Sequence, residues 1–145
     1  SLFGQPDRVL ASVECHGDIV MNGDTLTAQV KFENGRTASL NAFTHTPFFS
    51  RLAIFGSEGW VEVRDKAHVQ APEGWYFTTC FTNGKPETVE YEVATPVLSN
   101  LECFADAVAG AATYPNTPEQ IVRNVSLLEA IVKSAATDEI VKIER

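Results

Sequence analysis

The residues whose types and spacing could do chemistry lie in the segment NAFTHTPFFSR, residues 41–51. His45 stands at the end of an expected strand, and Pro47 interrupts the strand pattern just after it. An imidazole exchanges protons near neutral pH, and a guanidinium binds oxygen-rich groups. We therefore expect His45, Thr46 and Arg51 to contribute to a small-molecule pocket. The alternative is that His45 is simply a hydrogen-bonded loop residue.

A second group of polar side chains occurs in ECHGDIVMNGD, residues 14–24. Carboxylates near a histidine suggest a metal site formed by Glu14, His16, Asp18 and Asp24. The spacing between residues 14 and 18 matches no known metal-binding loop, so we favour an exposed acidic turn and predict no metal. His68 lies in a turn-like segment, and we place it and His16 at the surface.

No residue pattern supplies a catalytic or cofactor-binding constellation. Ser57 in GSEG lacks the spacing of a nucleophile elbow, and a strand follows where a helix would be needed. No G-x-G-x-x-G or P-loop pattern occurs. Cys15, Cys80 and Cys103 are an odd number at wide spacing, which is typical of reduced thiols in a cytoplasmic protein. We therefore assign no catalytic, cofactor-binding or metal residue.

The first two thirds of the chain have the pattern of antiparallel strands. Residues 25–32, TLTAQVKF, alternate strictly between apolar and polar side chains, which indicates one buried face. Asn34-Gly35 follows and predicts a hairpin with a type I′ turn. The other expected strands are residues 8–15, 36–45, 50–55, 59–64, 75–81, 88–93 and 140–143.

Two helices are expected near the C-terminus. The first has Leu101, Phe104, Ala105 and Val108 on one face, with Ser99 or Asn100 as its N-cap. The second has Thr117 as N-cap, Pro118 at the first helical position and Gln120 completing a capping box. Its expected apolar face is formed by Ile121, Val125, Leu128, Val132 and Ala135.

These elements predict an α+β fold over residues 1–145: one domain with a large, mainly antiparallel open sheet of six to eight strands. Both C-terminal helices are expected to cover one face of the sheet. The other face is then either solvated or an interface. Its expected residues are Thr25, Thr27, Gln29, Ser39, Asn41 and Thr78.

The composition limits the classes of partner. The chain has 145 residues, 44% hydrophobic and 21% charged, as in globular proteins. Its formal net charge of −8 argues against binding to nucleic acid, because phosphate backbones repel an acidic surface. No apolar run approaches the roughly 20 residues that span a bilayer, so we expect no membrane partner.

Three segments together carry a family resemblance: LAIFGSEGWVEV at residues 52–63, the D-x-x-x-x-x-V-x-F-x-N-G pattern from Asp24 to Gly35, and FADAVAGAATYPNTPEQIVRNVSLLEAIVKSA at residues 104–135. In this order and spacing they resemble the C-terminal domain of the Gfo/Idh/MocA oxidoreductases, the glucose–fructose oxidoreductase and inositol dehydrogenase family. The resemblance covers roughly residues 2–145. It implies a fold like the C-terminal domain of glyceraldehyde-3-phosphate dehydrogenase.

The resemblance also implies what the whole protein would do. Family members join an N-terminal Rossmann domain, which binds NAD or NADP and carries the catalytic lysine, to a C-terminal domain that closes a sugar or polyol pocket and forms subunit contacts. A helix with a catalytic histidine precedes the segment that resembles Ser1–Gly4. We therefore expect this chain to be the substrate-pocket and oligomerisation domain of an NAD(P)-dependent oxidoreductase, inert in isolation, with the missing Rossmann domain and further copies as partners.

Two other functions remain open at this point. The chain could be a stand-alone dimerising or small-molecule-binding module without redox activity, since its folding signals run from the first strand to the last. A hydrolase or isomerase that uses His45 with a nearby carboxylate is the third possibility, but no nucleophile–base pair stands at a recognisable spacing.

Overall fold

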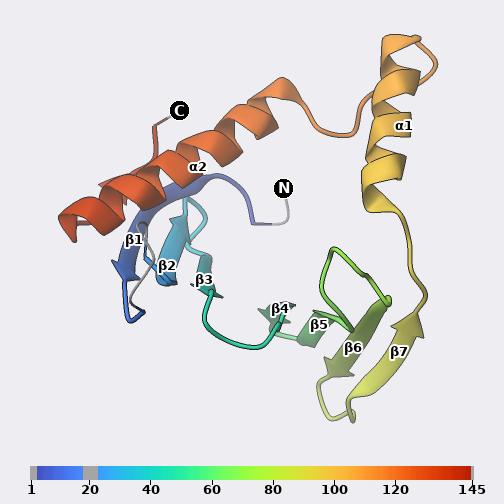
Figure 1. Cartoon of the computed structure of the whole chain (residues 1–145), viewed down its shortest axis with the longest axis horizontal. Helices are drawn as coiled ribbons and strands as arrows, with labels where there is room; N and C mark the ends of the chain where they lie inside the picture. The colour runs from blue at the N-terminus through green and yellow to red at the C-terminus, as the bar shows by residue number, and fades with distance from the viewer. Residues whose placement is uncertain (1–2, 18–22, 145) are drawn as a thin grey trace. The chain divides into compact units, whose positions relative to one another are not determined.

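The computed structural model describes residues 3–17 and 23–144 (Figure 1). Within them lie eight strands and two helices: β1 Pro6–Glu14, β2 Thr25–Phe32, β3 Thr37–Phe43, β4 Arg51–Gly56, β5 Gly59–Asp65, β6 Trp75–Phe81, β7 Glu87–Tyr91, α1 Pro96–Val108, α2 Pro118–Thr137 and β8 Val141–Lys142. The α+β class is confirmed. None of the described helices is both long and apolar enough to cross a membrane.

The strands form two antiparallel sheets of four, in the orders β3-β2-β1-β8 and β4-β5-β6-β7. The prediction of six to eight strands is met, but they do not continue through one hydrogen-bonded sheet. The division falls at the segment with Pro47, between β3 and β4, where the chain leaves the first sheet. The structure correspondingly groups into two compact units, residues 1–45 with 114–145, and residues 46–113. Each unit is described by itself.

In the first unit, the predicted alternation of β2 determines which side chains are buried. β1 pairs with β2 so that Val9 lies opposite Val30 and Ala11 opposite Ala28, and all four side chains are buried. α2 packs on this face and contributes buried Ala130 and Ile131, as Figure 1 shows for the helix lying across β1. Ile143, just after β8, completes the buried cluster.

The face of α2 that meets the sheet shares only Ala135 with the predicted one. Ala130, Ile131 and Ser134 are buried, with Leu127 and Ala135 packed beside them. The predicted Ile121, Val125, Leu128 and Val132 are 49–70% exposed. Small side chains at positions 130 and 134 let the helix approach β1 closely. There the Ser134 hydroxyl, and not a neighbouring strand, is the hydrogen-bond partner of the Ala11 N–H in β1. The fully buried Ser134 accepts a hydrogen bond from Ala11 N–H at 2.9 Å and donates one to Glu139 C=O at 2.6 Å.

The ends of both helices test the cap predictions. The capping box of α2 is confirmed: Thr117 Oγ1 accepts from Gln120 N–H, and Gln120 Oε1 accepts from Thr117 N–H. The cap of α1 is corrected, because the helix begins at Pro96 and its N-cap is Thr95, without a side-chain cap bond. Proline at the first helical position makes this start possible since its ring fixes φ in the helical range. None of the residues of α1 is buried.

The hairpin between β2 and β3 forms as predicted, but with a different turn. A type I′ turn needs positive φ at both central residues, whereas of Asn34 and Gly35 only Gly35 has a positive φ, at 83°. Asn34 instead uses its side chain, which accepts a hydrogen bond from Arg36 N–H and donates one to Phe3 C=O. The amide therefore ties the turn to the N-terminal segment.

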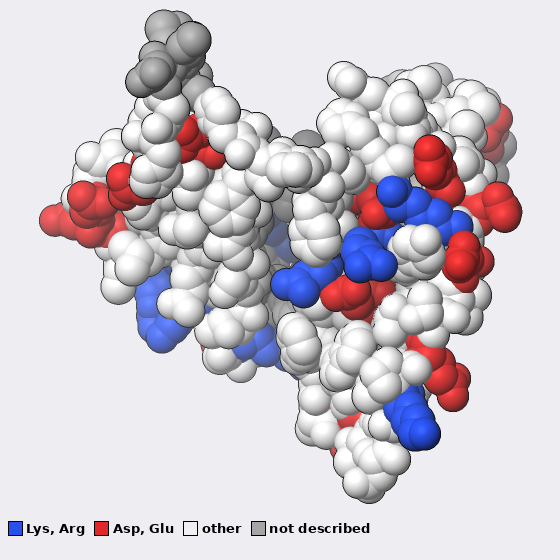
Figure 2. Space-filling view, turned by 60° about the horizontal axis from the view of Figure 1, so that its bottom comes forward, with Lys and Arg blue, Asp and Glu red and all other residues white. Residues whose placement is uncertain are grey.

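In the second unit, the register gives the sheet two chemically different faces. One face carries Arg51, Arg64, Tyr76 and Glu90 in a row across the four strands. The opposite face is mainly apolar and includes Leu52, Ile54, Val61, Val63, Phe77 and Val89. Basic side chains lie beside acidic ones on part of the surface in Figure 2, and ion pairs join Arg51 to Glu62 and Lys66 to Glu90.

Candidate functional site

The first unit holds a buried carboxylate next to the predicted pocket histidine. Asp24, just before β2, is only 5% exposed. Its Oδ2 accepts hydrogen bonds from the backbone N–H groups of His16 at 2.8 Å and Gly17 at 2.7 Å, and its Oδ1 accepts one from the Thr25 hydroxyl at 3.1 Å. The backbone of Asp24 pairs with Glu14 on one side and Thr44 on the other, both at 2.9 Å. Asp24 is thereby fixed from both neighbouring strands.

The hydrogen bonds of Asp24 control its ionisation. Burial acts to raise the pKa of this carboxyl group, but the N–H donors of His16 and Gly17, the Thr25 hydroxyl and the charge of His16 together outweigh burial and lower the pKa below its ordinary value. Asp24 is therefore an ionised carboxylate near neutral pH.

His45 follows β3 and lies over this carboxylate. Its Nδ1 is 3.5 Å from Asp24 Oδ2 and 3.4 Å from Thr44 Oγ1. The ring packs on the backbone of Gly17, where a Cβ would lie 3.0 Å from His45 Cε1. The side chain is 61% exposed, so the imidazole is accessible to a ligand while one edge is held against the protein.

Thr46 and Arg51, the other predicted pocket residues, belong to the second unit. Thr46 lies in the exposed bend before β4. Arg51 is the first residue of β4, with Nη1 3.6 Å from Glu62 Oε2 and its guanidinium 5.9 Å from the centre of the Phe49 ring. Because the three residues divide between the units, a pocket shared by all three stays a prediction.

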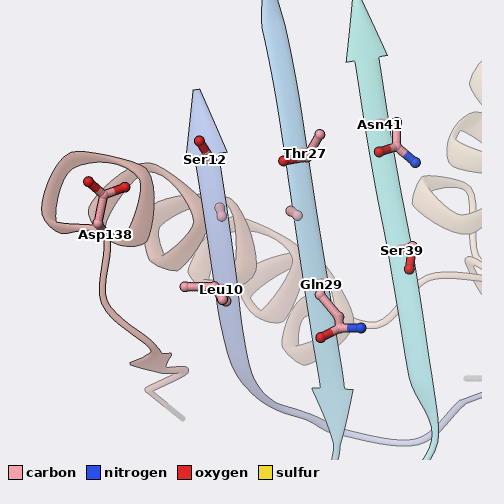
Figure 3. Close-up of a pocket in the computed structure, with 9 residues that line it drawn as sticks. Leu10, Ser12, Thr27, Gln29, Ser39, Asn41 and Asp138 are labelled. Atoms are coloured by element: carbon pink, nitrogen blue, oxygen red, sulfur yellow. The ribbon is translucent and has the colours of Figure 1, made fainter. Parts of the chain in front are cut away.

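The open face of the first sheet, opposite α2, has a shallow hollow of about 410 Å³ (Figure 3). Hydroxyl and amide side chains dominate its lining, and the labelled sticks of β1, β2 and β3 lie on one side of the strands. The lining includes Ser12, Thr27, Gln29, Ser39 and Asn41, with Leu10 and Asp138. Four of these residues are those predicted for the open face. Thr25 lies on the same face of β2, opposite Phe43 and outside the hollow, and its hydroxyl bonds to Asp24. Thr78 lies in the second sheet, where it bonds to Thr88.

The acidic-turn interpretation is wrong for Asp24, which is buried and structural, whereas Asp18 lies outside the described residues. Glu14 is exposed and accepts a hydrogen bond from Ser12. Among residues 3–17 and 23–144, no three His, Cys, Asp or Glu side chains are arranged to hold a metal ion. Ser57 lies in the exposed β4–β5 turn, where its hydroxyl donates to Glu58 Oε1 at 3.5 Å.

Sequence reasoning missed the Asp24–His45 pair. The two residues are distant along the chain and were assigned to different features. The signal that points to it is positional: an acidic residue directly before a strand lies beside the end of the next antiparallel strand once the hairpin closes.

Comparison with known proteins tests the family resemblance. Residues 1–62 match the model of the GFO/IDH/MocA C-terminal domain. The resemblance to this domain is confirmed. No curated protein matches the sequence.

Solved structures extend the likeness over nearly the whole chain. A protein from Desulfitobacterium hafniense assigned as an NADPH-dependent oxidoreductase matches 98% of this chain with a TM-score of 0.85 and 18% identity. Aldose-aldose oxidoreductase from Caulobacter crescentus, complexed with glycerol, matches 96% with a TM-score of 0.78 and 19% identity. The WlbA dehydrogenase from Bordetella pertussis, in complex with NADH and UDP-GlcNAcA, matches 99% with a TM-score of 0.72 and 18% identity. At these identities the likeness shows a shared fold.

The chain spans only part of these proteins: 43%, 42% and 40% of their respective lengths. The chain described here therefore corresponds to less than half of each.

Proposed function

We propose that this chain is the substrate-facing and subunit-contacting domain of an NAD(P)-dependent oxidoreductase that acts on a sugar, a polyol or a related compound. The observation that carries the proposal is the fold match of 96–98% of the chain to two proteins described as oxidoreductases, at TM-scores of 0.78 and 0.85. The match to the GFO/IDH/MocA model supports it independently.

The dinucleotide is proposed to bind outside these 145 residues, in a Rossmann domain. The described residues do not fit it: the sequence has no glycine fingerprint, and the hollow in the first sheet is lined by hydroxyls and amides without a helix N-terminus for phosphate. We therefore assign no redox step to this chain. Its contribution is to bind and orient substrate, with His45, Thr46 and Arg51 as the proposed contacts.

The open face of the first sheet is the proposed contact between subunits. Polar side chains cover most of it, but Leu10 and Phe43 on the same face are 45% and 56% exposed. Apolar groups within a polar face are typical of protein interfaces. Light scattering of the purified chain should give the mass of a dimer or larger assembly, and a concentration-independent monomer would refute this part of the proposal.

The size of the native product tests the larger claim. An immunoblot of source cells with an antibody to this domain should show a band at more than twice 15.8 kDa, in line with the share of the similar proteins that the chain spans. A band at 15.8 kDa would favour the alternative, a stand-alone dimerising or small-molecule-binding module without redox activity.

The substrate contacts are tested in the full-length enzyme. His45→Ala and Arg51→Ala should raise KM in assays of NAD- and NADP-dependent oxidation of glycerol, myo-inositol and glucose, whereas exposed Lys85→Ala is the matched control. The purified 145-residue chain should show no turnover. Turnover by that chain, or unchanged KM in both variants, would contradict the assignment.

A further inference from the structure

Asp24 and His45 form a pair whose geometry restricts what His45 can recognise. The carboxylate cannot swing away, because Oδ2 receives two backbone N–H groups and Oδ1 receives the Thr25 hydroxyl. The backbone next to His45 is fixed as well, since Thr44 N–H donates to the Asp24 carbonyl at 2.9 Å. The imidazole, packed on Gly17, has its Nδ1 edge toward this carboxylate.

The protonation of Nδ1 follows from counting donors. A threonine hydroxyl has a single hydrogen, and the Thr44 hydroxyl lies where it donates to Asp24 C=O, at 3.4 Å. Its oxygen, 3.4 Å from His45 Nδ1, is then an acceptor toward the ring. The other neighbour of Nδ1, Asp24 Oδ2, is an ionised acceptor at 3.5 Å. Two acceptors face Nδ1, so this nitrogen carries the hydrogen.

We propose that Asp24 is the positioning residue for His45: it holds the neutral ring with Nδ1–H toward the protein and leaves the lone pair of Nε2 facing outward. Nε2 then accepts a hydrogen bond and selects a ligand group with an O–H donor, such as a sugar or polyol hydroxyl, over a carboxylate or phosphate. This inference rests on the proposed substrate role of His45 and specifies the chemistry of that contact.

The test is the tautomer of His45 in the full 145-residue chain. Long-range 1H–15N NMR spectra distinguish Nδ1–H from Nε2–H in neutral rings, under mildly alkaline conditions. His68 is an internal reference of the opposite kind, because its Nδ1 accepts a hydrogen bond from Gln70 N–H at 3.2 Å and its hydrogen must be on Nε2. His45 should show Nδ1–H as its major tautomer in the same spectrum.

Two variants change the pair in different ways. Asp24→Asn removes the charge but also disturbs a buried network and could unfold the chain. Gly17→Ala keeps the carboxylate and both N–H donors and puts a Cβ where it meets His45 Cε1 and Nε2, at 3.0 and 3.3 Å. The same Cβ lies 3.4 Å from Asp24 Oδ2, an ordinary van der Waals contact. Gly17→Ala should therefore displace the ring and reduce the Nδ1–H tautomer of His45 to a minor form, with His68 unchanged.

Each result decides between the claims. If His45 has the same tautomer as His68, or keeps Nδ1–H undiminished in folded Gly17→Ala, the positioning role of Asp24 is overturned. If the tautomer is as expected but His45→Ala leaves KM unchanged in the full-length enzyme, positioning stands and the substrate role fails. If His45→Ala raises KM but His45 lacks the Nδ1–H tautomer, the substrate role stands and the positioning role of Asp24 fails.

Discussion

Replacing Ser134 with alanine should destabilise the first unit more than any surface change, because one hydroxyl there serves two backbone groups. β8 pairs with β1 only at Arg8 and Val9. The next inward N–H of that edge, at Ala11, therefore lacks a strand partner and donates to Ser134 Oγ at 2.9 Å. The same hydroxyl donates to Glu139 C=O at 2.6 Å, in the connection from α2 to β8.

The magnitude follows from the groups left behind. Ser134 has no exposed surface, and water cannot readily replace its hydroxyl. An unsatisfied buried donor or acceptor costs about 1–3 kcal/mol. Two such groups predict a loss of about 2–6 kcal/mol in the free energy of unfolding for Ser134→Ala. This is a large share of the roughly 5–15 kcal/mol that stabilises an ordinary domain.

Urea unfolding followed by circular dichroism measures this loss as a fall in the transition midpoint. The matched control is Thr137→Ala in the same helix, where the exposed hydroxyl bonds only to Lys133 C=O at 3.0 Å. Hydrogen exchange at the Ala11 amide should also become faster in Ser134→Ala alone. If Ser134→Ala and Thr137→Ala lose the same small amount, about 0.5 kcal/mol or less, the reasoning about the sheet edge is wrong.

Three further predictions use the same unfolding measurement. Ile131→Ala should lower the free energy of unfolding by about 2–5 kcal/mol, because the Ile131 side chain is buried. Leu128→Ala should lower it by no more than about 1 kcal/mol, because Leu128 is 61% exposed. Equal losses would show that α2 packs through the predicted face instead. Gly74→Ala should destabilise the protein much more than Gly35→Ala. Both glycines have a positive φ, but only at Gly74 would a Cβ overlap a backbone oxygen, that of Tyr91. Gly35→Ala should cost about 1–2 kcal/mol of unfolding free energy, and a comparable loss in Gly74→Ala would argue against the overlap. The lowered pKa of Asp24 means that its contribution to stability is complete above the ordinary carboxyl pKa of 3.8 and is lost as pH falls through the folded pKa. Asp24→Asn should therefore make stability depend less steeply on pH in the acid range. An unchanged slope would show that Asp24 does not contribute to this dependence.

Local signals in the sequence predicted local structure well. The alternation of residues 25–32 gave β2 its bounds and its buried face. The Thr117-Pro118 start of α2 formed with its full capping box. Both signals depend on residues a few positions apart, whose interactions form in any fold that contains the element.

The contact face of α2 could not be predicted in the same way. Hydrophobicity favours the stripe of Ile121, Val125 and Leu128, yet the helix packs through Ala130, Ile131 and Ser134. The choice depends on the short β8, which leaves an N–H of β1 for Ser134 to satisfy. Periodicity measures how much apolar area a face offers, whereas the partner surface decides how closely a backbone can approach and which polar groups need bonds.

The same argument explains why the sequence predicts Asp24 to be a surface charge, whereas in the structure it is buried and holds the backbone of residues 16 and 17. In the sequence it closes an acidic segment, and its bonds to His16 and Gly17 span eight and seven residues across that segment. Closure of the hairpin from β2 to β3 then brings His45 beside it. A buried carboxylate is stable only where enough donors surround it, so the site exists because one turn and two strands converge there. Gly17 is the most informative position to test, because the imidazole occupies the space that a side chain there would need. A methyl group at Gly17 therefore moves the ring without removing either of the polar groups, Asp24 and Thr44, that the ring contacts.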